Sequence, residues 1–300
     1  MKTLILLHGW GAHAGAWQRQ VEWLGAERIE EVGGGGKGPE ALSPSPGPPP
    51  PIPYRGLGEN VGARLAVPSA GKNVEQPPPA VEAAGEGTCS TCPGPLLNIF
   101  TPTIPSWPPD WLADYLKNFF LSETIIVGWS LGGMLLLETL AAGGIHPAHL
   151  VLVGVAPVFC RRPDHPWGQP PAAVRAMRRA LRSDANRVLQ DFASRCLAPG
   201  EETYRQEVDG LFSGGYLESD LAQGLDYLLN ADLRPLLPNL AGAVTIIQGE
   251  QDRIVEAAQA RYLQEHLPGS SLFLLPGAGH LPFWTQAGAF NRILRDIINH

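Results

Sequence analysis

Short apolar runs recur along most of the chain and are separated by stretches of helical periodicity. Continuous apolar runs of this kind are typical of strands buried on both faces of a parallel sheet. They cover 3–7, 96–100, 124–127, 149–155, 244–248 and 271–275. Apolar positions spaced as on one face of a helix cover 15–24, 111–119, 134–142, 171–181 and 287–298. The alternation predicts an α/β fold with a mostly parallel, doubly wound sheet.

The third apolar run leads into Gly128-Trp129-Ser130-Leu131-Gly132, and a helical pattern follows at once. A G-x-S-x-G sequence between a strand and a helix is the signature of a nucleophile elbow. We expect a strained backbone at Ser130, and we expect Gly128 and Gly132 to let strand and helix approach closely. The amide of Leu131 would then point at a developing oxyanion. A chance match in a chain with 35 glycines is the competing interpretation.

An acid and a base follow later strands in the order that this elbow requires. Asp252 comes just after the run 244–248, and His280 follows the run 271–275 through a glycine turn. The order Ser…Asp…His at three strand ends predicts a catalytic triad of Ser130, Asp252 and His280. Glu250 is the competing acid, and Asp252 alone could be a turn residue or a helix cap.

His8-Gly9-Trp10-Gly11 follows the first apolar run. An early strand that ends in a His-Gly turn is where this type of fold builds the second half of its oxyanion hole, so the backbone N–H of Trp10 is the candidate donor. For His8 itself we favour a structural role in the turn.

Residues 33–95 interrupt the alternation, because 13 Gly and 14 Pro fill this stretch of 63 residues. Such a composition buries too little apolar surface to offset its ordering entropy, so we predict a disordered insertion. Cys89 and Cys92 within it could form half of a zinc site or a redox pair. No second Cys/His pair is nearby, so we favour two exposed thiols and predict no metal site.

Between 157 and 240 the apolar runs typical of strands are absent and helical patterns dominate, which predicts a helical lid. Arginines recur at i, i+3, i+4 and i+7 on one face of its clearest helix, at Arg175, Arg178, Arg179 and Arg182. This stripe could attract an acidic protein that presents a tethered acyl chain, or it could be a solvated basic face. The expected core therefore consists of 1–32, 96–156 and 241–300.

Composition narrows the class of protein further. A net charge of −7 argues against a nucleic-acid partner. Four cysteines form no disulfide framework, and no apolar run reaches the roughly 18 residues of a membrane span. We expect a soluble, cytoplasmic and monomeric protein.

With these residues in place, the chain resembles the BioH family of carboxylesterases, which are α/β-hydrolases that cleave the methyl ester of pimeloyl-acyl carrier protein in biotin synthesis. The resemblance covers roughly 1–30 and 96–300 and rests on His8 to Gly11, Gly128 to Gly133, Gly249 to Asp252, Gly279-His280 and Pro282-Phe283. It implies the triad, the two oxyanion amides and a helical lid whose arginines engage the acyl carrier protein, with no cofactor. We expect the substrate to be bound by Trp10, Phe283, Arg161 and Arg162.

Two features depart from the family pattern. The usual Asp-x-Pro-Gly-x-Gly loop is replaced by 101–107, and 33–95 has no counterpart. Two alternatives stay open: a general short-acyl carboxylesterase or related carbon–carbon bond hydrolase that uses no carrier protein, and a binding protein with an inactive triad.

Overall fold

A computed structural model describes residues 2–25, 27–29, 62–66, 96–102, 104, 110–213 and 216–300. Its strands are β1 Lys2–Leu7, β2 Glu27–Ile29, β3 Gly62–Ala66, β4 Leu96–Phe100, β5 Thr124–Trp129, β6 His149–Val153, β7 Val244–Gly249 and β8 Ser271–Leu275. Its α-helices are α1 Gln18–Trp23, α2 Asp110–Leu116, α3 Leu131–Gly143, α4 Pro171–Cys196, α5 Arg205–Leu211, α6 Glu218–Asn230, α7 Ala257–His266, α8 Pro282–Thr285 and α9 Ala287–Asn299.

The eight strands form one sheet in the order β2-β3-β4-β1-β5-β6-β7-β8. The six strands from β4 to β8 in this order are all parallel, and β3 pairs antiparallel with β2 and β4. The predicted mostly parallel α/β sheet is therefore confirmed. The chain moves from β1 to β4 on one side and then to β5 on the other, so a topological switch point lies at β1 and β5. Open α/β sheets place ligand sites beside the carboxyl ends of strands at such a point.

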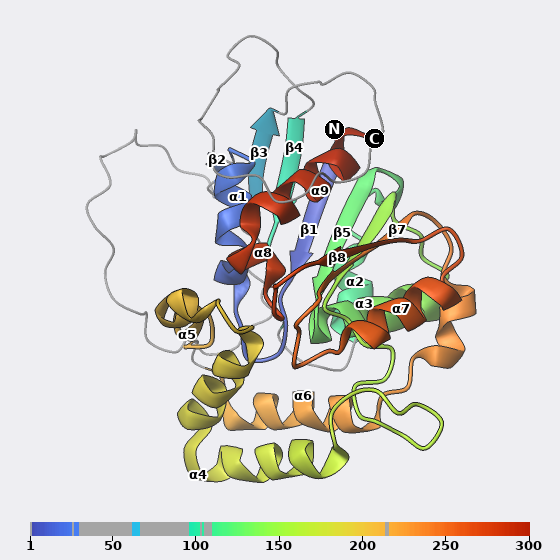
Figure 1. The fold of residues 1–300 in the computed structure, drawn as a ribbon. Coiled ribbons are helices and arrows are strands. Elements are labelled where there is room, and N and C mark those ends of the chain that lie inside the picture. Colours follow the sequence, from blue (N-terminus) through green and yellow to red (C-terminus); the bar gives the residue numbers. More distant parts are fainter. Residues whose placement is uncertain are drawn as a thin grey trace.

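Helices cover both faces of the sheet (Figure 1). Helices α1 and α9 contact each other on one face, and α2 packs beside α3 on the other. The central strand β5 is buried at every position, as its apolar sequence predicts. Helix α3 is also buried almost all round, and Glu138 is the single half-buried residue between Leu131 and Ala141. An amphiphilic α3 was expected, but this helix lies between the sheet and its neighbours rather than at the surface.

The segment 33–95 contains one feature that its composition did not predict. Residues 62–66 form β3, which pairs along its whole length with β4, for example Arg64 with Asn98. Gly-Ala-Arg-Leu-Ala has no β-branched residue, so the strand depends on backbone pairing with its neighbours rather than on its own propensity. The rest of the segment, including Cys89 and Cys92, lies outside the described residues.

Between β6 and β7 the chain leaves the sheet and forms α4, α5 and α6 beyond the carboxyl ends of the strands (Figure 1). Helices α4 and α6 pack side by side. Helix α4 continues well past the predicted end at residue 181, but it is broken at Asp184, whose backbone is extended at φ −160° and ψ 90°. The Asp184 carboxylate accepts a hydrogen bond from the amide of Arg187 at 2.9 Å, so it caps the second half as a new helix.

Candidate active site

Ser130 occupies the turn between β5 and α3. Its φ of 53° and ψ of −122° make it the only non-glycine residue with a positive φ in the described part of the chain. The turn is tight because glycines lie on both sides of it. A β-carbon built on Gly128 would lie 2.5 Å from Cα of Gly133, and one on Gly132 would lie 2.3 Å from the carbonyl oxygen of His8. The sequence at this turn therefore forces the strained conformation typical of a nucleophilic serine.

Asp252 and His280 meet through a hydrogen bond of 2.7 Å between Nδ1 of His280 and Oδ2 of Asp252. Both side chains are completely buried. The other carboxylate oxygen accepts from the amides of Ile254 at 2.8 Å and Val255 at 2.9 Å. Four donors, including the side chain of Gln248, hold this carboxylate in one orientation. The competing acid Glu250 is exposed and has no such role.

The second ring nitrogen of His280, Nε2, is buried and has no hydrogen-bond partner within the described residues. A histidine that is fixed through Nδ1 and free at Nε2 has the state that a general base needs. Ser130 does not fill this position, so its hydroxyl is not yet hydrogen-bonded to the base. Catalytic hydrogen bonds commonly tighten only when substrate binds.

Contacts at the ends of β5 and β6 bring His280 to the same place as Ser130. The amide of Ser130 donates to the carbonyl oxygen of Val153 at 2.9 Å. The next residue, Gly154, lies against the base, because a β-carbon built there would be 3.0 Å from both Cε1 and Nδ1 of His280. The indole of Trp129 also donates to the carbonyl oxygen of His280 at 3.0 Å. The three predicted triad residues thus converge at one edge of the sheet.

The loop after β1 lies directly against the nucleophile. A β-carbon built on Gly9 would lie 3.1 Å from Cβ of Ser130. In the described part of the chain, the amides of Trp10 and Leu131 take part in no hydrogen bond. Two free amides beside a nucleophile could stabilise an oxyanion, and this role stays a prediction.

His8 is a structural residue of that loop. Its Nδ1 contacts the carbonyl oxygen of Gly9 at 3.0 Å, and its Nε2 accepts from the amide of Ile104 at 3.1 Å. Burial lowers the pKa of His8 to about 4, because a charged imidazole loses its hydration there. His8 is therefore neutral near pH 7, and it bridges the two loops after β1 and β4.

Two residues that the sequence did not single out hold the acid and the base in place. The side-chain nitrogen of Gln248 donates to Asp252 Oδ2 and to the carbonyl oxygen of Val255, each at 2.9 Å. Buried Glu201 accepts from the amides of Ala198 at 2.7 Å and Gly279 at 3.1 Å through one carboxylate oxygen. Glu201 thereby ties the end of the lid helix to the loop that carries the base. The position of Gln248 at the end of β7 was a weak sign of its role in the sequence. Nothing in the sequence around Glu201 indicated its role.

Cys196, at the end of α4, is next to the base but is not a second nucleophile. Its carbonyl oxygen accepts from the amide of His280 at 2.8 Å. Its thiol is fully buried, and burial raises the pKa of this thiol well above its usual range. A thiol that stays protonated is a poor nucleophile, which leaves Ser130 for that role.

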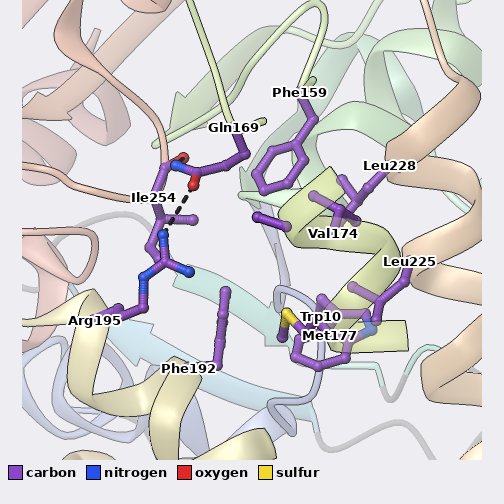
Figure 2. A pocket seen from close by; sticks show the side chains of 11 residues that line it. Trp10, Phe159, Gln169, Val174, Met177, Phe192, Arg195, Leu225, Leu228 and Ile254 are labelled. Carbon is purple, nitrogen blue, oxygen red and sulfur yellow. Dashed lines mark hydrogen bonds between the residues drawn. The ribbon is translucent and has the colours of Figure 1, made fainter. Parts of the chain in front are cut away.

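A cavity opens beside these residues, between α4, α6 and the loops after β1 and β7 (Figure 2). Its lining consists of Trp10, Phe159, Gln169, Ala173, Val174, Met177, Phe192, Arg195, Leu225, Leu228 and Ile254. Neither Ser130 nor His280 is part of this lining. The link to the site comes from Trp10, next to the predicted oxyanion hole, and from Ile254, whose amide binds Asp252.

Of the four predicted substrate contacts, only Trp10 lines this cavity, and the roles of the other three stay predictions. Phe283 is buried in the core against Trp17, with ring centroids 4.4 Å apart. Arg161 donates to the carbonyl oxygen of Gly168 at 3.2 Å. Arg162 donates to the carbonyl oxygen of Asn230 at 2.8 Å. Both arginines thus tether the loop before α4 through backbone carbonyls of the lid.

The predicted arginine stripe is only partly free. Arg175, Arg179 and Arg182 are exposed on α4, and no ion pair or hydrogen bond of the described residues uses their side chains. Arg178 instead forms a two-pronged pair with Asp226 of α6, at 2.5 and 2.7 Å. It fastens two lid helices together, so the available stripe has three arginines rather than four.

No group of three or more His, Cys, Asp or Glu side chains in the described ranges could hold a metal ion. Across the same residues, no helix is long and apolar enough to cross a membrane.

Comparison with known proteins finds relatives that match most of this chain or about two thirds of it. A pimeloyl-[acyl-carrier protein] methyl ester esterase of Nitrosomonas europaea is 26% identical over 285 residues, which cover 93% of this chain and 89% of that protein. An enzyme of the same name from Chromobacterium violaceum is 30% identical over 199 residues, which cover 65% of this chain and 78% of that protein.

Among solved structures, an esterase from Exiguobacterium antarcticum superposes with a TM-score of 0.71 at 18% identity, covering 100% of this chain and 92% of that one. A bromoperoxidase from Bacillus anthracis gives a TM-score of 0.69, also at 18% identity, with the same coverage of 100% and 92%. These two similarities show the fold. The sequence profile of the alpha/beta hydrolase family matches residues 4–293, a range that spans the elbow serine and the buried Asp–His pair, and the chain belongs to this family.

Proposed function

We propose that this protein is a serine carboxylesterase that hydrolyses the methyl ester of pimeloyl-acyl carrier protein in biotin biosynthesis. The observation that carries the esterase part is the buried pair of Asp252 and His280, with Nε2 of His280 free beside a strained Ser130. The names of the two bacterial relatives support the choice of substrate.

In this mechanism His280 takes the proton of the Ser130 hydroxyl as its oxygen attacks the ester carbonyl. Asp252 keeps His280 oriented and stabilises the imidazolium. The amides of Trp10 and Leu131 donate to the oxyanion of the tetrahedral intermediate. His280 then protonates the departing methoxide. Methanol dissociates, and an acyl-serine remains on the enzyme. Water attacks the acyl-serine with His280 again as base, which releases the acid and restores Ser130.

The cavity beside the triad suits the acyl chain. Most of its wall is apolar, and Trp10 and Phe192 meet there edge to face with ring centroids 5.1 Å apart. The Trp10 indole is fixed by a hydrogen bond of 2.9 Å to the carbonyl oxygen of Leu221 in α6. Burying one methylene group of the substrate contributes roughly 0.8 kcal/mol to the free energy of binding, so several methylenes give useful binding energy.

The three unpaired arginines of α4 support a carrier-bound substrate. Arg175, Arg179 and Arg182 lie at i, i+4 and i+7 on a lid helix whose other side lines the cavity. An acidic carrier protein that docks on this stripe would deliver its tethered chain beside the cavity. Exposed charges of this kind mainly speed association, and salt screens them over about 8 Å at physiological ionic strength.

Hydrolysis of pimeloyl-carrier methyl ester tests the proposal, with a small neutral methyl ester as second substrate. We expect wild type to cleave both and Ser130→Ala to cleave neither. An Arg175/Arg179/Arg182→Ala variant should lose carrier-bound turnover about tenfold at low salt and keep small-ester turnover. Arg187→Ala is the matched control, because Arg187 is exposed on the other half of α4 and its side chain pairs, among the described residues, only with Asp191 at 4.0 Å.

Two outcomes favour the alternatives. Cleavage of small esters with no preference for the carrier-bound one, and no effect of the triple variant, would indicate a general short-acyl carboxylesterase. Failure of a fluorophosphonate probe to label Ser130, together with no turnover of either substrate, would indicate a binding protein with an inactive triad.

A further inference from the structure

The cavity has one polar corner in an otherwise apolar wall. Of its eleven lining residues, only Gln169 and Arg195 have side chains that end in an amide or a charged group. Figure 2 shows these two side chains pointing toward each other at one side of the cavity, with Phe159, Val174 and Leu228 on the opposite side. A ligand that fills the cavity would therefore meet hydrocarbon along most of its length and a guanidinium at one place.

Both amide donors of Gln169 are used, and its side chain serves to position Arg195. Its amide nitrogen donates to the carbonyl oxygens of Arg253 and Ile254, both at 2.9 Å. Its amide oxygen accepts from Nη2 of Arg195 at 2.8 Å. The loop after β7 thus fixes Gln169, and Gln169 fixes the guanidinium at the edge of the cavity. A positioned guanidinium loses less entropy on binding a ligand than a free one.

Arg195 keeps most of its donors and has no acidic partner in the part of the chain that the structure describes. A guanidinium has five N–H groups, and only one of them is used within the described residues. A second cation, Arg253, is close by, because its guanidinium donates to the carbonyl oxygen of Leu197, two residues beyond Arg195. Glu256 follows Arg253 on the same loop and accepts from the amide of Gly168 at 3.3 Å, so Arg195 and Arg253 outnumber this acid. The corner is therefore electropositive and open to an anion.

We infer that Arg195 binds a free carboxylate at the far end of the acyl chain, so that the enzyme also hydrolyses carrier-free monomethyl esters of dicarboxylic acids. The ester end lies at Ser130, the methylenes fill the apolar cavity, and the carboxylate pairs with the guanidinium in the two-pronged geometry that arginine favours. The half-ester and water give the diacid and methanol by the same acyl-serine route. This inference rests on the proposed esterase activity, and it adds an activity that needs no carrier protein.

Three free esters of equal chain length test the inference: the monomethyl ester of heptanedioic acid, its dimethyl ester and methyl heptanoate. We expect wild type to show a KM for the half-ester about tenfold below those of the two neutral esters, which corresponds to about 1.4 kcal/mol. Arg195→Gln should remove this difference by raising the KM of the half-ester alone. Arg195→Lys should keep part of it, because a lysine supplies charge without the fork.

Arg187→Gln is the matched control, since it removes an exposed arginine from the same helix away from the cavity. Equal KM values for all three esters in wild type, or an unchanged ratio in Arg195→Gln, would overturn the inference while leaving the esterase proposal intact. Activity on carrier-bound ester alone, with no turnover of the free half-ester, would also overturn it. If no ester is cleaved and Ser130 resists a fluorophosphonate probe, the proposed function itself fails.

Discussion

The loops after β1 and β8 each bury a histidine completely, yet the two histidines differ in their second ring nitrogen. Both nitrogens of His8 have partners, on Gly9 and Ile104. In His280 only Nδ1 has one, on Asp252, and Nε2 has none within the described residues. Burial therefore does not separate a structural histidine from a catalytic one. The distinguishing feature is a ring nitrogen without a hydrogen-bond partner, because a general base must be able to accept a proton there.

Among changes that affect His280 and not His8, Asp252→Asn should have the largest effect on turnover. The amide cannot fix His280 in the tautomer that leaves Nε2 free, so kcat should fall about 10⁴-fold with KM changed little. Steady-state kinetics on a small methyl ester measures this, and thermal unfolding checks that the variant is folded. A loss smaller than tenfold in a folded variant would mean that Asp252 does not orient the base.

Gln248→Leu, a change in β7 that reaches His280 through Asp252, should have a smaller effect on turnover. It removes one donor to Asp252 and leaves the carboxylate with its two amide donors and His280, so kcat should fall roughly tenfold to a hundredfold. Gln259→Leu is the matched control, because this buried glutamine bonds His165 at 2.8 Å and Val158 at 2.7 Å, away from the acid. Equal losses of kcat per folded molecule in both variants would show that Gln248 supports only stability.

The smallest effect on turnover should come from His8→Gln, which instead changes how stability depends on pH. The pKa of His8 is about 4 when folded and 6.5 when unfolded, so only the unfolded chain binds a proton between these values. Stability contributed by neutral His8 is thus fully present above pH 6.5 and is lost as the pH falls toward 4. The shift is worth about 3 kcal/mol.

Urea unfolding at several pH values between 4 and 7 checks this prediction. Wild type should lose stability more steeply than His8→Gln as the pH falls, while kcat per folded molecule at pH 7 stays within about threefold, because the loop makes no proton transfer. Parallel pH profiles for the two proteins would show that His8 does not carry this linkage.

Much of the fold could be predicted because buried parallel strands appear as apolar runs. The runs 96–100 and 271–275 match β4 and β8 at both ends. The strand β3 could not be found in this way, since a short segment without β-branched residues depends on its neighbours for pairing.

The candidate site divides in a similar manner. Ser130, Asp252 and His280 carry local signals, because each follows a strand through a turn. Glu201 carries no local signal, since its role depends on contacts with Gly279, 78 positions away in the chain. The packing of Phe283 could not be predicted for a different reason: its position near the base is visible in the sequence, but the direction of its ring toward Trp17 is set by core packing.

The break at Asp184 divides the lid helix α4 into two halves with different roles. The outer half bears the unpaired arginines and ends before the break, and the inner half bears Phe192 and Arg195 and ends at the loop of His280. Because the backbone is not helical at Asp184, the exposed face of the outer half can change with its partner, while Val174 and Met177 on its other face and the whole inner half stay tied to the cavity and the base. A lineage could thus exchange the molecule that delivers its substrate without rebuilding the site that cleaves it.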